Sequence, residues 1–262
     1  MLGLSPLVVL TLLAAGTPEY SGDSVVNAAS YRAGPLAPNT YVTIYGQNLS
    51  YVTRALGPQD LRADELPTAL AGANVRVRVG AILAQLTYVS PTQINALVPA
   101  NLVPGAIDIA VFREGIWGPT VKIELRRASP ALFLMDAETV IGTHADGSLI
   151  DGTSPARPGE TVVLYATGLG TTAPPQEYGK LAPGPARLVG DAQFHVVLEG
   201  EELDGSRIDY AGIAPGFAGL YQINVRLPEA LTANPEIRVR CRDEWSPAGL
   251  RLLVEPAASS AR

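Results

Sequence analysis

Apolar and polar residues alternate with a period of two in many short segments of the chain. Such alternation places one face of a β-strand in a core and the other face in water. No long stretch shows the 3.6-residue period of an amphipathic helix, so the pattern predicts an all-β protein. The clearest alternating segments are residues 75–79, 107–111, 121–125, 194–198 and 237–241.

Proline and glycine pairs separate these segments, as expected for turns between short strands. Examples are Gly34-Pro35, Pro104-Gly105, Pro158-Gly159 and Pro215-Gly216. The pattern predicts two antiparallel β-sandwiches of the immunoglobulin type, each with about seven strands.

An internal repeat supports this division. Residues 38–49 align with residues 158–169 at a constant shift of 120. Further matched pairs follow in the same order: Gln93 with Gln222, Asn95 with Asn224, and Trp117 with Trp245. We therefore predict a first sandwich over residues 17–129, a second over residues 130–256, and a C-terminal tail over residues 257–262. The apolar junction at residues 129–136 predicts that the two sandwiches pack against each other rather than joining through a flexible linker.

The first 16 residues contain an apolar run that is too short for a membrane span. Small residues and a polar segment follow it, which is typical of a secretory signal peptide, although no positive charge precedes the run. We predict a signal peptide at residues 1–16, with a buried strand as the alternative, and hence a location outside the cell or on its surface.

Composition removes several classes of function. The net charge is −6 and the pI is near 5.0, which disfavours nucleic acid as a partner. One cysteine and two histidines provide neither a disulfide framework nor a zinc site. We expect no metal, no other cofactor and no membrane-spanning segment.

Five sequence blocks together carry a family resemblance: residues 25–49, 86–99, 146–170, 210–228 and 246–254. They include VTIYGQNL, QINALVP, GETVVLYATGLG, QINVRLP and SPAGLRLLV. The chain resembles the Solibacter-type uncharacterised C-terminal domain family, which occurs at the ends of secreted and cell-surface bacterial proteins. Each half is similar to an IPT/TIG immunoglobulin-like domain. The resemblance implies this fold and an extracellular location, and it implies no particular activity.

Candidate catalytic patterns are weak, so we predict no catalytic residue and no enzyme activity. His144 and His195 are the available histidine bases, but no G-x-S-x-G elbow accompanies them. Gly168 and Gly170 imitate a dinucleotide fingerprint, which requires a following helix, whereas Pro174 and Pro175 come next. The acidic residues 199–204 indicate a solvated loop, with weak calcium binding as the minor alternative.

The remaining polar positions have structural interpretations. Cys241 shares a face with Ile237 and Val239, so it is predicted to be buried and unreactive. The amides of Gln93, Asn95, Gln222 and Asn224 are predicted to bond to the backbone of neighbouring loops.

Trp117 and Trp245 are the candidate ligand-binding residues, because an exposed indole can stack on a sugar or anchor a protein partner. The alternative is that each ring caps the end of its own sandwich. We predict a non-enzymatic extracellular module for adhesion or protein interaction, with an unidentified protein or polysaccharide as partner. The alternative function is a carbohydrate-binding module that uses the two tryptophans.

Overall fold

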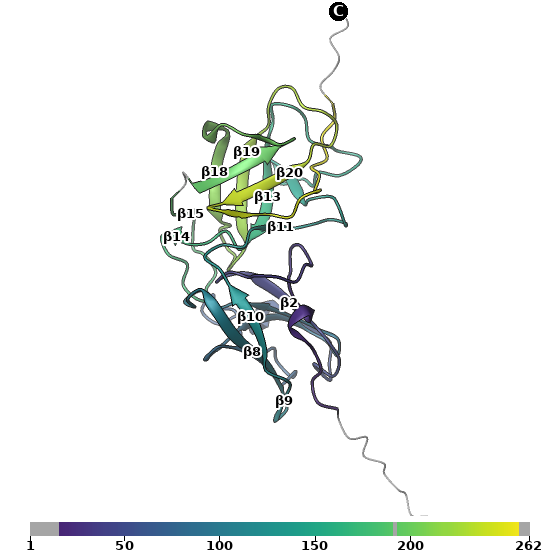
Figure 1. Ribbon diagram of the computed structural model, residues 1–262, viewed down its shortest axis with the longest axis vertical. Coiled ribbons are helices and arrows are strands. Elements are labelled where there is room, and N and C mark those ends of the chain that lie inside the picture. The colour runs from purple at the N-terminus through teal and green to yellow at the C-terminus, as the bar shows by residue number, and fades with distance from the viewer. Residues whose placement is uncertain (1–15, 191–192, 257–262) are drawn as a thin grey trace, which may run out of the picture.

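The computed structural model describes residues 16–190 and 193–256. Apart from Gly16, the predicted signal peptide lies outside the described residues, as does the predicted tail at residues 257–262. The described chain forms four antiparallel sheets, two in each half, and the halves follow one another along the long axis (Figure 1). In the described part of the chain, short 3₁₀ turns accompany the strands at η1 (Gly22–Ser24), η2 (Pro58–Asp60) and η4 (Gly205–Arg207). Within the described residues no helix is long and apolar enough to cross a membrane.

The first half contains a five-stranded sheet facing a sheet of four strands and a side hairpin. The first sheet has the order β1-β2-β7-β6-β3, and the second has the order β10-β8-β4-β5 with β9 paired to β8. Their bounds are β1 (Val25–Asn27), β2 (Tyr41–Tyr45), β3 (Arg54–Ala55), β4 (Val75–Val79), β5 (Ile82–Leu83), β6 (Gln85–Val89), β7 (Gln93–Leu97), β8 (Gly105–Arg113), β9 (Ile116–Trp117) and β10 (Val121–Leu125).

The second half repeats this arrangement. Its larger sheet has the order β11-β13-β19-β18-β15-β14 with β12 paired to β13, and its smaller sheet has the order β17-β16-β20-β21. Their bounds are β11 (Ala131–Leu132), β12 (Gly142–His144), β13 (Thr161–Thr167), β14 (Thr172–Ala173), β15 (Ala186–Leu188), β16 (Phe194–Leu198), β17 (Glu201–Glu202), β18 (Ile208–Ile213), β19 (Tyr221–Arg226), β20 (Ile237–Cys241) and β21 (Glu244–Trp245).

The repeat extends to the pairing of individual residues. Tyr45 pairs with Gln93 in the first half, and Tyr165 pairs with Gln222 in the second. The β6/β7 and β18/β19 pairs also share an irregularity, because the register shifts just before Tyr88 in one and just before Tyr210 in the other. The prediction of two duplicated immunoglobulin-like β-sandwiches is therefore confirmed.

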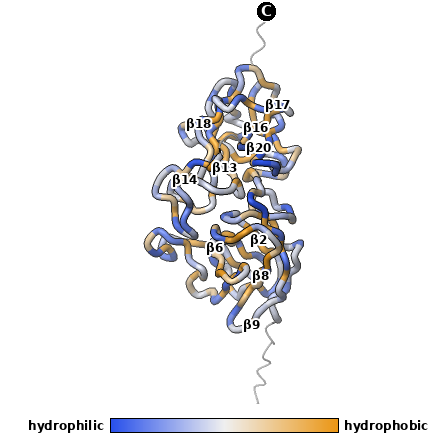
Figure 2. Tube along the Cα trace, turned by 60° about the vertical axis from the view of Figure 1, so that its left-hand side comes forward, coloured by the Kyte–Doolittle hydropathy of each residue, from blue (hydrophilic) through white to orange (hydrophobic). Residues whose placement is uncertain are grey.

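Each sandwich has its own apolar core, made by the inward residues of the alternating segments. Val75, Val77 and Val79 are completely buried in the first core, and Val196, Ile237 and Val239 are completely buried in the second. Figure 2 shows hydrophobic strands inside each half, with hydrophilic segments around them.

The two sandwiches are joined by direct contacts between loops. The amide of Leu66 donates to the carbonyl of Gly179, and the amide of Leu181 donates to the carbonyl of Asp64, both at 2.8 Å. These bonds form a short antiparallel bridge between the loop before β4 and the loop after β14. A third apolar cluster lies beside it, with buried Leu66, Leu97 and Ala218 drawn from both halves.

Candidate functional site

Both candidate tryptophans lie on short hairpin strands at equivalent places in the two sandwiches. Trp117 on β9 pairs with Phe112, and Trp245 on β21 pairs with Arg240. The two rings are half exposed, at 49% for Trp117 and 43% for Trp245. The duplication has therefore placed one accessible indole at the same point of each sandwich.

Strand arginines lie against both indoles. The guanidinium of Arg78 lies 5.3 Å from the ring centroid of Trp117, and the Phe112 ring lies 5.0 Å away at a tilt of 55°. Arg238 and Arg240 lie 4.6 and 5.4 Å from the Trp245 ring. These arginines alternate with core residues, so the rings rest on the outer faces of the sheets.

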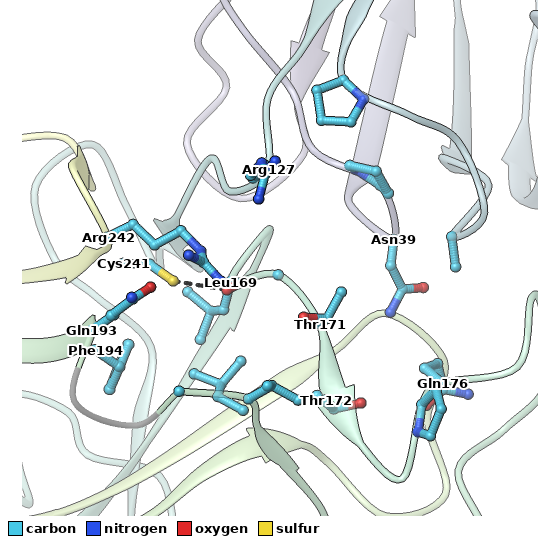
Figure 3. Close-up of a pocket in the computed structure, with 18 of the residues that line it drawn as sticks. Asn39, Arg127, Leu169, Thr171, Thr172, Gln176, Gln193, Phe194, Cys241 and Arg242 are labelled. Carbon is cyan, nitrogen blue, oxygen red and sulfur yellow. Dashed lines mark hydrogen bonds between the residues drawn. The ribbon is translucent and has the colours of Figure 1, made fainter.

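A second candidate site was not visible in the sequence. It is a cavity of about 420 Å³ between the two sandwiches, shown in Figure 3. The first sandwich contributes Pro38 and Asn39 and the loop from Ala100 to Pro104. The second contributes the loop from Leu169 to Thr172 and residues at the β16 end of the sandwich.

Two exposed arginines border this cavity. Neither Arg127 nor Arg242 forms an ion pair or a side-chain hydrogen bond with the described residues, and both are exposed. No aspartate or glutamate is among the described residues that line the cavity.

The arginine positions follow from backbone hydrogen bonds. Arg242 adopts a left-handed conformation with φ 57° in the β20–β21 turn, and its amide donates to the carbonyl of Gln193 at 2.7 Å. Arg127 lies between two tethered neighbours, since the amide of Arg126 donates to Leu36 and the amide of Ser129 donates to Gly168, each at 2.8 Å. The backbone that carries each arginine is therefore held in place by hydrogen bonds to other segments of the chain.

Cys241 lies in the wall of the same cavity. Its thiol donates to the carbonyl of Leu169 at 2.9 Å, and the residue is buried as predicted. Burial raises the pKa of the Cys241 thiol from 9.0 to about 11, with a smaller opposing effect from the charge of Arg242. Since the thiolate is the nucleophilic form, this cysteine is held in its unreactive state.

His144 lies in a chain of polar contacts that the sequence did not reveal. Its Nδ1 lies 3.0 Å from a carboxylate oxygen of Glu160, and its Nε2 lies 3.2 Å from both the hydroxyl and the carbonyl oxygen of Ser154. The order Ser–His–Glu matches that of a catalytic triad. However, the amide of Ser154 donates to Asp151 at 2.9 Å and is not free to bind an oxyanion.

The acidic loop has a structural partner rather than a metal-binding geometry. Glu202 on β17 contacts Nδ1 of His195 with one oxygen and accepts a hydrogen bond from Arg240 at 3.1 Å with the other. His195 projects outward from β16, as its alternation with Phe194 and Val196 predicted. In the described part of the chain, no group of three or more His, Cys, Asp or Glu residues has a metal-binding arrangement.

The repeated amides pair with each other, so the predicted bonds to neighbouring loops are wrong. Gln93 donates to the side-chain oxygen of Asn95, and Gln222 donates to that of Asn224, both at 2.8 Å. Residues two apart on a strand share a face, which brings each pair of side chains together. The glycine segment at 168–170 leads into strand β14 and not into a helix, so the context needed for dinucleotide binding is missing there.

Comparison with known proteins gives distant structural matches. The chain is similar to surface glycan-binding protein B of a Bacteroides ovatus mixed-linkage glucan utilization locus, solved with a heptasaccharide, at 11% identity and a TM-score of 0.35, covering 92% of this chain and 47% of that one. It is also similar to domains 5–6 of the S-layer protein SbsC, at 10% identity and a TM-score of 0.31, covering 92% and 100% of the two chains. A third match is the extracellular region of plexin A4, at 12% identity and a TM-score of 0.28, covering 96% and 20%.

This chain spans less than half the length of the glycan-binding protein and of the plexin region. These TM-scores are low, so the fold assignment rests on the strand order and register described above. No protein-family model and no curated protein sequence matches the chain.

Proposed function

We propose that this chain is a non-enzymatic, two-domain binding module that acts outside the cell or on its surface in adhesion or protein interaction. The observation that carries the proposal is the pair of exposed indoles, each resting on arginine at the same place in its sandwich. Tryptophan and arginine are enriched at the energetic centres of protein interfaces. Two copies at a fixed separation also allow a bivalent interaction, in which the second contact forms at a high effective concentration.

The extracellular location is supported by the sequence. The apolar segment at the start has the length and the following small residues of a secretory signal. The five blocks that resemble the Solibacter-type C-terminal domain family, and the IPT/TIG-like segment Val42–Leu49, point in the same direction. We propose membership of that family on these blocks. Detection of the protein in the culture medium or on intact cells, with the segment before residue 17 removed, tests this part of the proposal.

Binding through the indoles is tested by chemical crosslinking of the full chain to extracellular proteins, comparing wild type with Trp117→Ala/Trp245→Ala. We expect the double variant to lose at least tenfold in crosslinked partner at equal protein concentration. Leu149→Ala is a matched control, because Leu149 is also half exposed but belongs to neither tryptophan hairpin. Retention of every partner by a well-folded double variant would refute the proposal.

The alternative is a carbohydrate-binding module that uses the same two rings. It is favoured by the exposed indole faces, since flat aromatic surfaces stack on the apolar faces of sugars. A glycan array separates the two functions: strong binding to a neutral polysaccharide that disappears in the tryptophan double variant would select the carbohydrate function over protein interaction.

We propose that the Ser154–His144–Glu160 chain is structural. In this role His144 connects the loop at residues 151–154 to the start of β13. Incubation of the full chain with p-nitrophenyl acetate and butyrate is expected to give no turnover above that of a His144→Gln variant. Turnover that disappears in both His144→Gln and Ser154→Ala would identify a hydrolase instead.

A further inference from the structure

We propose that Tyr20 is a positioning residue of the Trp117 hairpin, so that the first indole is held by the N-terminal segment of the chain and the second indole is not. This segment, residues 16–21, is called the N-terminal strap below. The inference rests on the proposed function only in taking the Trp117 indole as a binding group, and its test requires no partner.

One strand amide in each half lies beside the end of the tryptophan hairpin. In the first half, the amide of Gly118 donates to the carbonyl of Val111 at 2.9 Å. In the second half, the amide of Ser246 donates to the carbonyl of Val239 at 2.8 Å. The repeat relates both pairs by the same shift of 128, so the two valines are equivalent. Both valines are completely buried, and a buried backbone amide needs an acceptor.

The two halves satisfy the valine amide with hydroxyls from different parts of the chain. In the second half, the amide of Val239 donates to the hydroxyl of Ser246 at 2.9 Å, next to the hairpin strand. The equivalent hairpin residue of the first half is a glycine, and the amide of Val111 donates instead to the hydroxyl of Tyr20 at 2.8 Å. The same hydroxyl donates to the carbonyl of Pro119. The strap therefore bonds both to strand β8 and to the segment that follows β9.

The internal repeat shows that the source of the hydroxyl has been exchanged. Glu19 forms an antiparallel bridge with Gln47, and strand β11 forms the equivalent pairing with Thr167. Leu132 of β11 therefore takes the place of Tyr20 in the second half, and leucine has no hydroxyl. The first half combines a tyrosine in the strap with a glycine in the hairpin, whereas the second combines a leucine with a serine. Each combination supplies one hydroxyl to the same amide.

The first sandwich leaves space for the strap at two glycines. A Cβ on Gly118 would lie 2.8 Å from Cε1 of Tyr20, and a Cβ on Gly46 would lie 2.2 Å from the carbonyl oxygen of Glu19. Both distances are well below a favourable non-bonded contact. Burial raises the pKa of the Tyr20 hydroxyl, which keeps it protonated and able to donate. The strap is thus a fitted part of the first sandwich.

The first indole therefore depends on a segment outside its own hairpin. Loss of the Tyr20 contact frees the amide of Val111 and the segment after Trp117, while the contact of Ser246 beside Trp245 stays in place. Displacing or cutting the strap would thus leave a module with one fixed indole instead of two.

Amide hydrogen exchange of the full chain, followed by NMR, tests this role in Tyr20→Phe, which removes only the hydroxyl. We expect the amide of Val111 to exchange about tenfold faster than in wild type, because it loses its acceptor, and the amide of Val239 to be unchanged. Ser246→Ala is the matched control, which should accelerate exchange at Val239 and leave Val111 unchanged.

Tryptophan fluorescence reports on each indole separately, since the chain has two tryptophans. In a Trp245→Phe background, Tyr20→Phe should raise the acrylamide quenching constant of Trp117. In a Trp117→Phe background, the same change should leave the quenching of Trp245 unaltered.

The repeat also provides a rescue experiment. Tyr20→Leu/Gly118→Ser copies the combination of Leu132 and Ser246 into the first half. It should return the exchange of Val111 to within about threefold of wild type, because the two changed residues share one contact. Gly118→Ser alone should lower stability, since its Cβ would overlap the Tyr20 ring.

Three results would overturn the proposal. The first is unchanged exchange at Val111 in a folded Tyr20→Phe protein. The second is equal acceleration at Val111 and Val239, because this would show general loosening rather than a local contact. The third is a double variant that does not fold or that exchanges as fast at Val111 as Tyr20→Leu alone. None of these measurements involves a binding partner, so failure of the crosslinking experiment would leave their outcome unaffected.

Discussion

The backbone amide of Tyr41 in the first sandwich donates a hydrogen bond to the side-chain hydroxyl of Thr167 in the second, at 3.0 Å. The same hydroxyl donates to the carbonyl of Gly219 at 3.2 Å. Thr167 is completely buried, so one side chain satisfies polar groups from both halves away from water. A buried backbone amide that loses its partner destabilises the fold by its desolvation penalty.

Thr167→Val keeps the shape of this residue and removes the hydroxyl. We expect the free energy of unfolding to fall by about 1–3 kcal/mol, because the Tyr41 amide and the Gly219 carbonyl lose a partner. Thr161→Val in the same strand is the control, since its hydroxyl forms no hydrogen bond with the described residues. Urea titration of both variants measures the difference; equal stability would show that the bond between the halves contributes nothing.

Alanine substitutions at two glycines separate the effect of packing between the sandwiches from the effect of backbone strain. Gly219 has φ +68°, and a Cβ there would lie 2.3 Å from Cδ1 of Leu97 in the other half. Gly216 has φ +81°, and a Cβ there would meet nothing within 4 Å. Alanine strains the backbone at both positions, by about 1 kcal/mol. Gly219→Ala should lower the free energy of unfolding by about 2 kcal/mol more than Gly216→Ala does, because its added methyl group also overpacks the contact between the sandwiches.

Limited proteolysis of the same two glycine variants tests how firmly the two sandwiches hold together. We expect Gly219→Ala to be cut faster at the junction near residues 126–130, while Gly216→Ala is cut like wild type. If wild type itself is cut rapidly into two stable halves, the contacts between the sandwiches are too weak to hold them together.

Burial of the Cys241 thiol predicts slow labelling. With a pKa of about 11 instead of 9.0, the thiolate fraction at pH 8 falls about 100-fold, and burial limits access further. Reaction with Ellman's reagent should be very slow in native protein and fast in urea. Because the folded pKa is the higher one, the burial contributes stability below about pH 9, and this contribution is lost as the pH rises through about 11. Rapid labelling of native protein at pH 8 would contradict the buried setting.

Arg113 is a buried cation without a carboxylate partner among the described residues. It is 1% exposed, it donates to the carbonyls of Asn48 and Gly16 at 2.5 Å each, and its guanidinium lies 4.1 Å from the Tyr51 ring. Arg113→Met should lower stability by about 2 kcal/mol, because two carbonyls lose their donor. Arg76→Met, on the outer face of the same sheet, should change it by less than about 0.5 kcal/mol. Equal shifts of the melting temperature in both variants would show that the buried hydrogen bonds of Arg113 contribute nothing to stability.

Much of the fold could be predicted from the sequence because its information is local or repeated. Alternation at residues 75–79 and 237–241 fixes which side chains face the core, and the matched Trp117 and Trp245 mark equivalent hairpins. The cavity could not be predicted in this way. Arg127 and Arg242 lie 115 positions apart and come together only through the packing of one sandwich on the other.

The amides show a different limit. Gln93 and Asn95 are spaced for contact along one strand face, and that spacing could have identified their bond. The contacts of His144 required the course of a loop, because Ser154 and Glu160 lie 10 and 16 residues away. The period of apolar residues identifies strands, but it does not show which part of the fold a loop contacts.

The described ends of the chain lie at opposite ends of the long axis, with the seam between the sandwiches midway (Figure 1). Tension applied from end to end therefore loads this seam, where the covalent connection near residues 126–130 is supplemented by the hydrogen bonds of Leu66 and Leu181 to the opposite half. Pulling the two halves apart therefore requires these hydrogen bonds to break.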